Sequence, residues 1–377
     1  MNFLRNWIQS NKEPLRIVGQ VMLFMATFVT TTLAGAEWTF GKSVFMPDFG
    51  WAEFALGLPF SLSFIGILTV HEFGHYFMAR YHGVKSSLPY YIPLPPFPLS
   101  IGTMGAIIRL RQRVPSNIQN FDIGIAGPLA GFVLAIMILF YGFTHLPEPS
   151  YIYQIHPEYE AYGDTYADQA YVPKEGMIDI VVGKNLLFMF FEKFVADPER
   201  MPNPHELMHY PLLFAGFLAL VFTSLNLLPI GQLDGGHVLY GLMGYKRHKQ
   251  IASMIFIAFI FYAGLGLLRP SDPVDDLVIY IPMYIFFLYL CFQGLKLARR
   301  DAIMYAFLVF ASQFVMVWMF PTVQGYSGWL LFAFMLGRFL GIDHPPCLIE
   351  VPLDPMRRWL GWLAVVIFVI NFTPAPL

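Results

Sequence analysis

The amino-acid sequence predicts an all-α polytopic membrane protein with eight or nine transmembrane helices. Of its 377 residues, 56% are hydrophobic and only 13% are charged, whereas soluble domains carry about 25% charged residues. The mean hydropathy is +0.56, and several apolar runs approach the roughly 20 residues that a helix needs to cross a bilayer. With a net charge of −2, we expect the lipid bilayer, and no nucleic acid, as a partner.

The apolar runs give nine expected spans, of which the last is short. In chain order they cover residues 17–36, 54–81, 123–143, 211–233, 251–268, 278–297, 302–320, 329–340 and 359–372. Because loops rich in Lys and Arg stay in the cytoplasm, Arg5 and Arg16 place the N-terminus inside, and the acidic loop 144–209 lies outside. We expect the first span to be retained rather than removed as a signal peptide, in a bacterial plasma membrane.

The second expected span contains the motif H-E-F-G-H at residues 71–75. Residues four apart share a helix face, so His71 and His75 can bind the same metal ion, and Glu72 projects about 100° away, beside that ion. Two imidazoles on Zn²⁺ with a carboxylate as proton acceptor are typical of metallopeptidases. If the histidines served only in packing, Glu72 would be a carboxylate buried in an apolar span without a function.

The connection between the second and third expected spans contains a membrane-associated hairpin or re-entrant segment. Its first half is rich in proline, which excludes the interior of a helix, and a glycine-punctuated, β-branched stretch follows. Irregular backbone at this depth needs protein or a water-filled cavity beside it. Four residues of the stretch are candidates for an edge that pairs with a substrate strand, namely Gly102, Thr103, Met104 and Gly105. A packed loop without substrate contact is the alternative.

The end of the fourth expected span supplies a third candidate ligand. Asn226, Gln232 and Asp234 follow a strongly apolar run that Pro229 bends or breaks. Ionisable residues within membranes are functional candidates, and Asp234 lies at the depth predicted for residues 71–75, near the cytoplasmic face. Alone, its Asp-Gly sequence would indicate a turn. Because two histidines, one carboxylate and an open water position make a catalytic zinc site, we predict one Zn²⁺ per chain.

A second H-E-x-x-H sequence occupies residues 205–209, just before the fourth expected span. The topology places it outside the membrane, at the end of that span opposite Asp234 and roughly 35 Å from it. The residues between His209 and Asp234 include no Asp or Glu that could complete a site. We therefore interpret residues 205–209 as a solvated beginning of a helix and not as a metal site.

Two further groups of residues have structural explanations. Gly127 and Gly131, four apart near the start of the third expected span, let another helix approach closely. We assign this pattern to packing and give it no chemistry. Isolated histidines are more often surface or packing residues than ligands, and we interpret several in that way: His82, His145, His237 and His344.

In combination, residues 71–75 and the distant L-D-G-G sequence at 233–236 resemble the site-2 protease family of intramembrane zinc metalloproteases, a peptidase M50-like group. The family pattern is H-E-x-x-H followed by N-P-x-P-x-x-x-L-D-G. This chain keeps Asn226, Pro229 and Asp234 in register but has Leu227 at the first proline. Segments 102–106 and 126–128 are also similar, so the resemblance extends over about 54–237. Members often carry a PDZ domain, which no segment here fits.

The resemblance implies that the chain hydrolyses peptide bonds in or near transmembrane segments of membrane-anchored protein substrates. Zn²⁺ held by His71, His75 and Asp234 would activate water and polarise the scissile carbonyl. Glu72 would act as the catalytic general base and then pass the proton to the leaving nitrogen. Asn226 is the candidate for holding the substrate backbone or the developing oxyanion, unless it only caps the break at Pro229.

Two other classes of function are the alternatives. An ion transporter predicts inverted repeats and charged residues on several spans, which are not visible in the sequence. A non-catalytic membrane scaffold would need no Glu72, because binding a metal requires only the ligands. We expect five regions: 1–53 with the first span, 54–143 and 210–248 as the two parts of the catalytic core, the extracytoplasmic loop 144–209 between them, and C-terminal helices at 249–377. No oligomeric state is predicted.

Overall fold

A computed structural model describes residues 12–97, 99–172 and 180–377, so Arg5 lies outside the described residues. The long helices are α2 (Lys12–Phe40), α4 (Leu58–Tyr81), α5 (Asn117–Thr144), α8 (Pro211–Asn226), α9 (Asp234–Gly264), α10 (Val274–Phe292), α11 (Arg299–Met319) and α13 (Pro355–Asn371). The short helices are α3 (Trp51–Leu56), α6 (Tyr166–Ala170), α7 (Leu186–Phe194) and α12 (Trp329–Met335). The 3₁₀-helices are η1 (Pro149–Gln154), η2 (Pro157–Thr165), η3 (Pro198–Arg200), η4 (Pro204–His209) and η5 (Gln293–Leu295), and η6 (Leu336–Leu340) is a π-helix.

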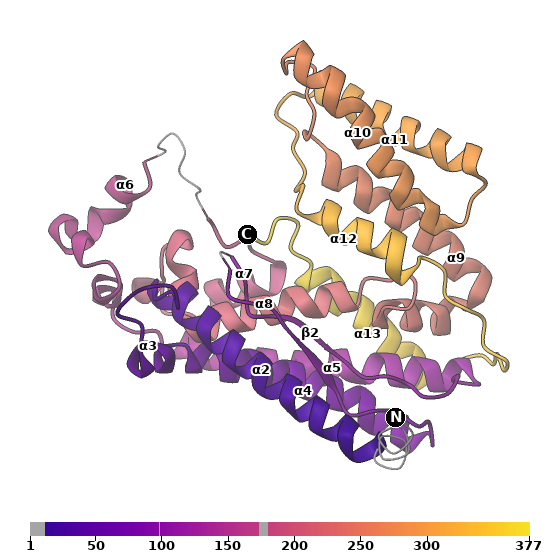
Figure 1. Cartoon of the computed structure of the whole chain (residues 1–377), viewed down its shortest axis with the longest axis horizontal. Helices are drawn as coiled ribbons and strands as arrows, with labels where there is room; N and C mark the ends of the chain where they lie inside the picture. Colours follow the sequence, from indigo (N-terminus) through magenta and orange to yellow (C-terminus); the bar gives the residue numbers. More distant parts are fainter. Residues whose placement is uncertain (1–11, 98, 173–179) are drawn as a thin grey trace, which may run out of the picture.

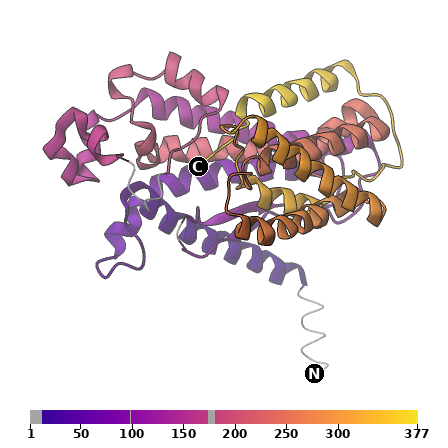
Figure 2. The same cartoon turned by 90° about the horizontal axis from the view of Figure 1, so that it is seen from above.

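The helices form two groups along the long axis of the molecule. α4 packs along α5 and also contacts α2 and α8, whereas α10 packs against α11. Figure 1 shows α2, α4 and α5 side by side, with α10 and α11 farther away and α9 and α12 nearer to the first group. Both views place the segment around α6 at one end of the molecule and α11 toward the other (Figures 1 and 2).

Four helical segments of the described chain are long and apolar enough to cross a membrane: Glu13–Phe40, Asn117–Thr144, Val274–Leu295 and Arg299–Met319. Two shorter apolar helices cover Pro211–Asn226 and Trp329–Leu340. The protein is therefore a mostly helical membrane protein, but the eight or nine expected spans are not confirmed. For two of the expected spans that are not among these four segments, the reason is physical. α4 carries the polar residues of its motif, and α8, with 16 residues, is about 24 Å long against a hydrocarbon core of about 30 Å.

The boundaries of two expected spans were wrong. The run 54–81 is divided into α3 and α4, because Pro59 lies in the first turn of α4 and cannot donate a backbone hydrogen bond to α3. The run 211–233 stops being helical at Asn226, and residues 227–233 form a series of turns. Asp234 consequently begins α9, rather than ending the preceding helix as we expected.

The expected hairpin is present between α4 and α5. Strand β1 (Tyr90–Pro93) pairs antiparallel with β2 (Thr103–Ile107), with Tyr91 opposite Ala106. β1 packs against α2, and β2 also contacts α4. The side chain of Thr103 donates to the carbonyl of Ile92, which fixes the two strands at the turn end of the hairpin. The hairpin therefore lies beside the helix that carries residues 71–75.

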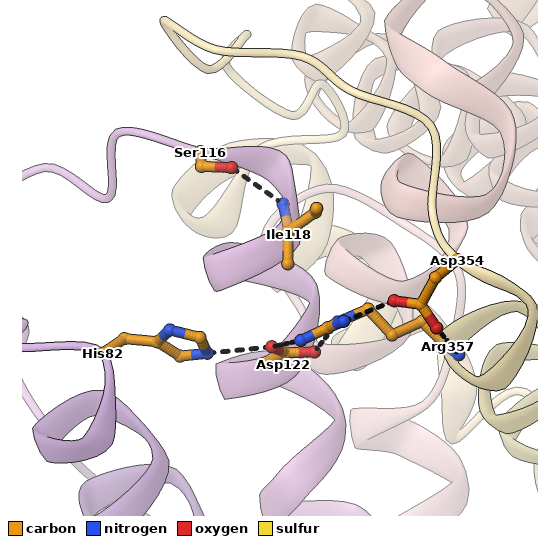
Figure 3. Close-up of polar contacts among 6 residues, drawn as sticks. All are labelled: His82, Ser116, Ile118, Asp122, Asp354 and Arg357. Atoms are coloured by element: carbon orange, nitrogen blue, oxygen red, sulfur yellow. Dashed lines mark hydrogen bonds and ion pairs between the residues drawn. The ribbon is translucent and has the colours of Figure 1, made fainter.

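A buried carboxylate connects three helices near the start of α5. Asp122 accepts hydrogen bonds from Arg357 of α13 at 2.7 and 2.8 Å, and Arg357 also pairs with Asp354. On its other side Asp122 lies 2.8 Å from Nε2 of His82, which follows α4 (Figure 3). Ser116 caps the same end of α5 by accepting from the amide of Ile118 (Figure 3). These bonds fix the ends of α4, α5 and α13 relative to one another.

Candidate metal centre

Three side chains from two helices converge on one point. His71 and His75 lie on one face of α4, and Asp234 is the first residue of α9. Nε2 of His71 is 3.0 Å from Nε2 of His75, and Oδ2 of Asp234 is 3.4 and 3.3 Å from these two nitrogens. The three atoms therefore form a nearly equilateral triangle.

This triangle fits a tetrahedral zinc ion. Zn²⁺ binds imidazole nitrogen and carboxylate oxygen at about 2.0–2.2 Å, which puts neighbouring ligand atoms about 3.4 Å apart. The observed separations of 3.0–3.4 Å are close to that value. Two imidazoles and one carboxylate leave a fourth position, as catalytic zinc sites do. The chemistry and the spacing of these side chains thus match the cation that the sequence predicts.

A hydrogen bond from the ring nitrogen that faces away from the site fixes the orientation of His75. Its Nδ1 lies 2.6 Å from the carbonyl oxygen of Ile123 in α5. A carbonyl can only accept, so Nδ1 carries the proton, and Nε2, which faces His71 and Asp234, is the nitrogen available to a metal ion. A hydrogen bond of this kind on the distal nitrogen is the usual support for a metal-bound histidine.

Glu72 lies beside this triangle and not within it. Its Oε1 is 4.0 Å from Nε2 of His71, and its side chain is only 8% exposed. All four residues line a cavity of about 290 Å³. The other residues around this cavity are Ala106, Ile107, Ile108, Leu110, Ile123, Gly124, Asn226, Gln232, Leu233, His237 and Leu340.

The glycines near the start of α5 provide the space in which the histidines sit. A Cβ atom on Gly127 would lie 2.1 Å from Nε2 of His75, and one on Gly131 would lie 3.0 Å from Cβ of His71. The helices approach closely, as the small residues predict. We predicted only a packing role for these two glycines, whereas they also lie against the candidate ligands. Their spacing of four residues, equal to that of His71 and His75, was the available signal.

The L-D-G-G sequence forms a tight turn at the start of α9. A Cβ atom on Gly235 would lie 1.9 Å from the carbonyl oxygen of Leu227, and one on Gly236 would lie 2.2 Å from that of Gly231. Only glycine lets the first turn of α9 fold back on the preceding loop this closely. The turn thereby holds Asp234 against α4.

The remaining predicted site residues lie at different distances from the triangle. Asn226 is close, with Nδ2 3.4 Å from Nε2 of His71. None of the four hairpin candidates, in β2 and just before it, is among the residues that line the cavity: a Cβ on Gly102 would meet the backbone of Thr30, and Met104 is 51% exposed. The residues that reach the cavity come just after them, at the end of β2 and beyond it, at 106–108.

His237, which we expected to be a surface or packing residue, lines the cavity. It lies three positions after Asp234 on α9, and its Nδ1 is 2.8 Å from Nε2 of His344. A second cavity of about 570 Å³, lined partly by Gln232 and His237, lies next to the first. The three-residue spacing from Asp234, which puts both on one helix face, could have indicated this position.

The second H-E-x-x-H sequence lies at the other end of α8, in η4. Our expectation that it is solvated was wrong, because Glu206 is 1% exposed and His209 is 8% exposed. The 16 residues of α8 separate it from the turn before Asp234, a distance of about 24 Å along the helix rather than the 35 Å that we expected. Asp234 therefore cannot lie beside both H-E-x-x-H motifs.

Comparison with known proteins identifies relatives that share these features. The model of peptidase family M50 matches residues 59–265. The Arabidopsis thaliana protein "Probable zinc metalloprotease EGY1, chloroplastic" is 30% identical over 58% of this chain and 34% of its own length. The Oryza sativa subsp. indica protein "Probable zinc metalloprotease EGY2, chloroplastic" is 28% identical over 59% of this chain and 34% of its own length. No solved structure gives a significant match.

These comparisons agree with the resemblance drawn from the two motifs. The chain spans about a third of the length of these curated relatives. Their names describe chloroplast proteins, which does not fit the bacterial plasma membrane that we expected. The matched region contains α4, α5, α8 and Asp234, and it covers more than half of the chain. The protein is therefore a member of peptidase family M50, the family of the site-2 proteases.

Proposed function

We propose that this protein is a zinc-dependent intramembrane endopeptidase that hydrolyses peptide bonds in or near transmembrane segments of membrane-anchored proteins. The proposal rests on one observation, the triangle of His71, His75 and Asp234 with Glu72 buried beside it. Membership of a family of peptidases, and the zinc metalloproteases among the relatives, agree with this chemistry.

Each residue has a separate role in the proposed reaction. His71, His75 and Asp234 would hold Zn²⁺, which would supply a Lewis acid for the scissile carbonyl and lower the pKa of a water molecule. Glu72 accepts a proton from the attacking water and transfers it to the leaving nitrogen. Asn226, whose amide reaches the same cavity, donates a hydrogen bond to the substrate backbone or to the developing oxyanion. The carbonyl of Ile123 keeps His75 in the required tautomer.

We further propose that the substrate binds as an extended strand along β2. A helix hides its carbonyl groups in internal hydrogen bonds, so a transmembrane substrate has to unwind before it is cleaved. Residues 103–107 form one of the two edge strands of a two-stranded sheet, and the segment 106–108 lines the cavity. Strand addition to such an edge, including Gly102, Thr103, Met104 and Gly105, would present successive peptide bonds to the metal centre.

We place the metal centre near the membrane face that carries the basic loops. Residues 71–75 belong to the last half of α4, which ends at Tyr81. The loop after β2 contains Arg111, which pairs with Glu13 at the start of α2. If α4, α8, α9, α12 and α13 are also embedded, the number of spans reaches the eight or nine expected from the sequence.

The test is cleavage of a panel of membrane-anchored peptides by the full chain and by Glu72→Gln. We expect the variant to keep its fold and its zinc at residues 71, 75 and 234, and to lose cleavage, because an amide cannot accept the proton. Glu37→Gln, the same change within α2 and away from the cavity, is the matched control and should cleave normally. Cleavage at the wild-type rate by Glu72→Gln would contradict the proposal, as would a zinc-free wild-type chain that still cleaves.

A further inference from the structure

A second cluster of potential metal ligands lies at the far end of α8 from the metal centre. It consists of His156, which precedes η2, and of Glu206 and His209 in η4. One ligand atom from each residue lies within 4.8 Å of the others. Nε2 of His156 is 3.2 Å from Nε2 of His209, which in turn is 3.4 Å from Oε2 of Glu206.

The type of helix explains which residues of the second motif meet. In an α-helix the two histidines of H-E-x-x-H share a face because they are four apart. In a 3₁₀-helix, with three residues per turn, residues three apart are eclipsed. η4 is a 3₁₀-helix, so Glu206 and His209 point the same way. His205 instead stacks on the ring of Tyr171, with centroids 4.0 Å apart.

Glu206 presents an unsatisfied oxygen to this cluster. Its side chain is buried, and Oε1 accepts a hydrogen bond from the hydroxyl of Tyr171. Oε2 is fully buried and has no hydrogen-bond partner among the described residues. A buried carboxylate without a partner is costly. A cation at the cluster would supply the missing partner.

The two imidazoles have the tautomers that metal binding needs. Nδ1 of His209 lies 2.9 Å from the carbonyl oxygen of Thr39, at the end of α2, and therefore carries the proton. Nδ1 of His156 lies 3.2 Å from the carboxylate of Glu158. With both Nδ1 atoms donating, the two Nε2 lone pairs face each other at 3.2 Å.

We propose that His156, Glu206 and His209 bind a second divalent cation of the zinc class. Two imidazole nitrogens and a carboxylate oxygen form a donor set that suits Zn²⁺. The carboxylate on His156 and the carbonyl on His209 are the outer hydrogen-bond partners that orient metal-bound histidines. The cation fastens the segment 149–165 to the start of α8 and the end of α2. Its role is structural, on the membrane side opposite the metal centre.

The first experiment counts zinc in the purified full chain by elemental analysis. We expect two zinc ions per chain in the wild type, one in His71→Ala, one in Glu206→Gln, and none in the double variant. Glutamine keeps the shape of Glu206 but loses its charge, and the zinc that remains at the metal centre reports that the variant is folded. If Glu206→Gln loses both ions, His156→Gln, at a partly exposed position, decides between loss of fold and loss of a ligand. A single zinc in the wild type that His71→Ala removes would overturn the proposal.

A matched variant distinguishes this site from one in which both histidines of the motif bind the metal. In His205→Phe the aromatic ring can still stack on Tyr171, but its nitrogen atoms are gone. We expect this variant to keep two zinc ions, because His205 is not one of the three ligands. Loss of one zinc in His205→Phe, with retention of both in His156→Gln, would show that our ligand assignment is wrong.

The second experiment measures the structural role in the His71→Ala background, where only the second site is left. We expect limited proteolysis within residues 149–209 to be at least tenfold slower with added zinc than with a chelator. Glu206→Gln in that background should remove the difference. Equal rates of cleavage with zinc and with chelator in His71→Ala would contradict a fastening role for the cation.

Discussion

The two H-E-x-x-H motifs of this chain have the same pattern but bring different side chains together. In α4 the motif lies within a regular α-helix, and its two histidines face Asp234. In η4 the motif lies in a 3₁₀-helix, and its glutamate and last histidine face His156. The lesson is that H-E-x-x-H predicts a pair of histidine ligands only when the segment is α-helical.

The prolines around η4 account for its different geometry. Pro204 begins the helix and Pro211 begins α8, which confines η4 to six residues between the two prolines. The residue before a proline is disfavoured in the helical region, and Tyr210 is accordingly extended, with φ −104° and ψ 92°. η4 therefore ends at His209. The α4 motif, by contrast, lies in a 24-residue helix with helical turns on both sides.

The largest expected difference in cleavage between the two motifs comes from replacing the first histidine of each by phenylalanine. We expect His71→Phe to reduce cleavage of membrane-anchored peptides by more than about a hundredfold, since even the outer partners of metal ligands contribute about 10–100-fold. His205→Phe should cleave within about twofold of the wild type, because His205 lies far from the metal centre and its phenylalanine replacement can still stack on Tyr171. Equal losses in the two variants would mean that the motifs do not differ in the way proposed here.

A second large effect should follow from Gly127→Ala. This change tests the close packing of α5 against the histidines of the first motif. The added Cβ would lie 2.1 Å from Nε2 of His75, whose ring is buried and held by Ile123. Because the ring has to leave its position, we expect zinc at the metal centre to be lost and cleavage to fall by about a hundredfold or more. Zinc analysis and the peptide assay measure both.

Gly66→Ala is the matched control for this change. Gly66 lies in the same helix as His71 and His75, and a Cβ atom there would have no neighbour within 4 Å. Alanine is also the better helix former by about 1 kcal/mol, so this variant should be at least as stable as the wild type and fully active. A Gly127→Ala chain with normal zinc and normal cleavage would show that the glycine face of α5 does not determine the position of His75.

The sequence was informative where a short motif lies in regular secondary structure. The positions of His71, Glu72 and His75 follow from helical periodicity, and Asp234 could be paired with them because two apolar runs were expected to end at the same depth. The hairpin followed from prolines that exclude a helix. These inferences needed only local geometry and the thickness of a bilayer.

The sequence was less informative where the backbone is irregular. Whether the chain after Asn226 continues as a helix or turns depends on contacts of Gly235 with Leu227 that no periodicity encodes. His156 precedes Glu206 by 50 positions, in a segment of short 3₁₀ turns, whereas we looked for a third ligand only downstream of His209. The sequence pattern also does not distinguish a 3₁₀-helix from an α-helix. In the second motif this difference decides which side chains meet.

The smallest expected effect concerns the outer support of the second cluster. In Tyr171→Phe the hydroxyl that bonds to Oε1 of Glu206 is removed, while the ring that stacks on His205 is kept. Loss of an outer partner lowers metal affinity by about 10–100-fold. We expect that decrease for zinc at the second site, measured by competition with a chelator in the His71→Ala background. Tyr162→Phe, an exposed tyrosine of the same segment, is the control and should bind zinc normally.

This last change also separates the two sites in the intact enzyme. Tyr171 lies beyond the far end of α8, and Glu72, His71 and His75 are not among its contacts. Cleavage by Tyr171→Phe should therefore be unchanged when zinc is abundant, although its second site binds more weakly. If cleavage fell in proportion to the loss of zinc at the second site, the two clusters would be coupled through α8. The second cation would then act on catalysis and not only on the attachment of residues 149–165.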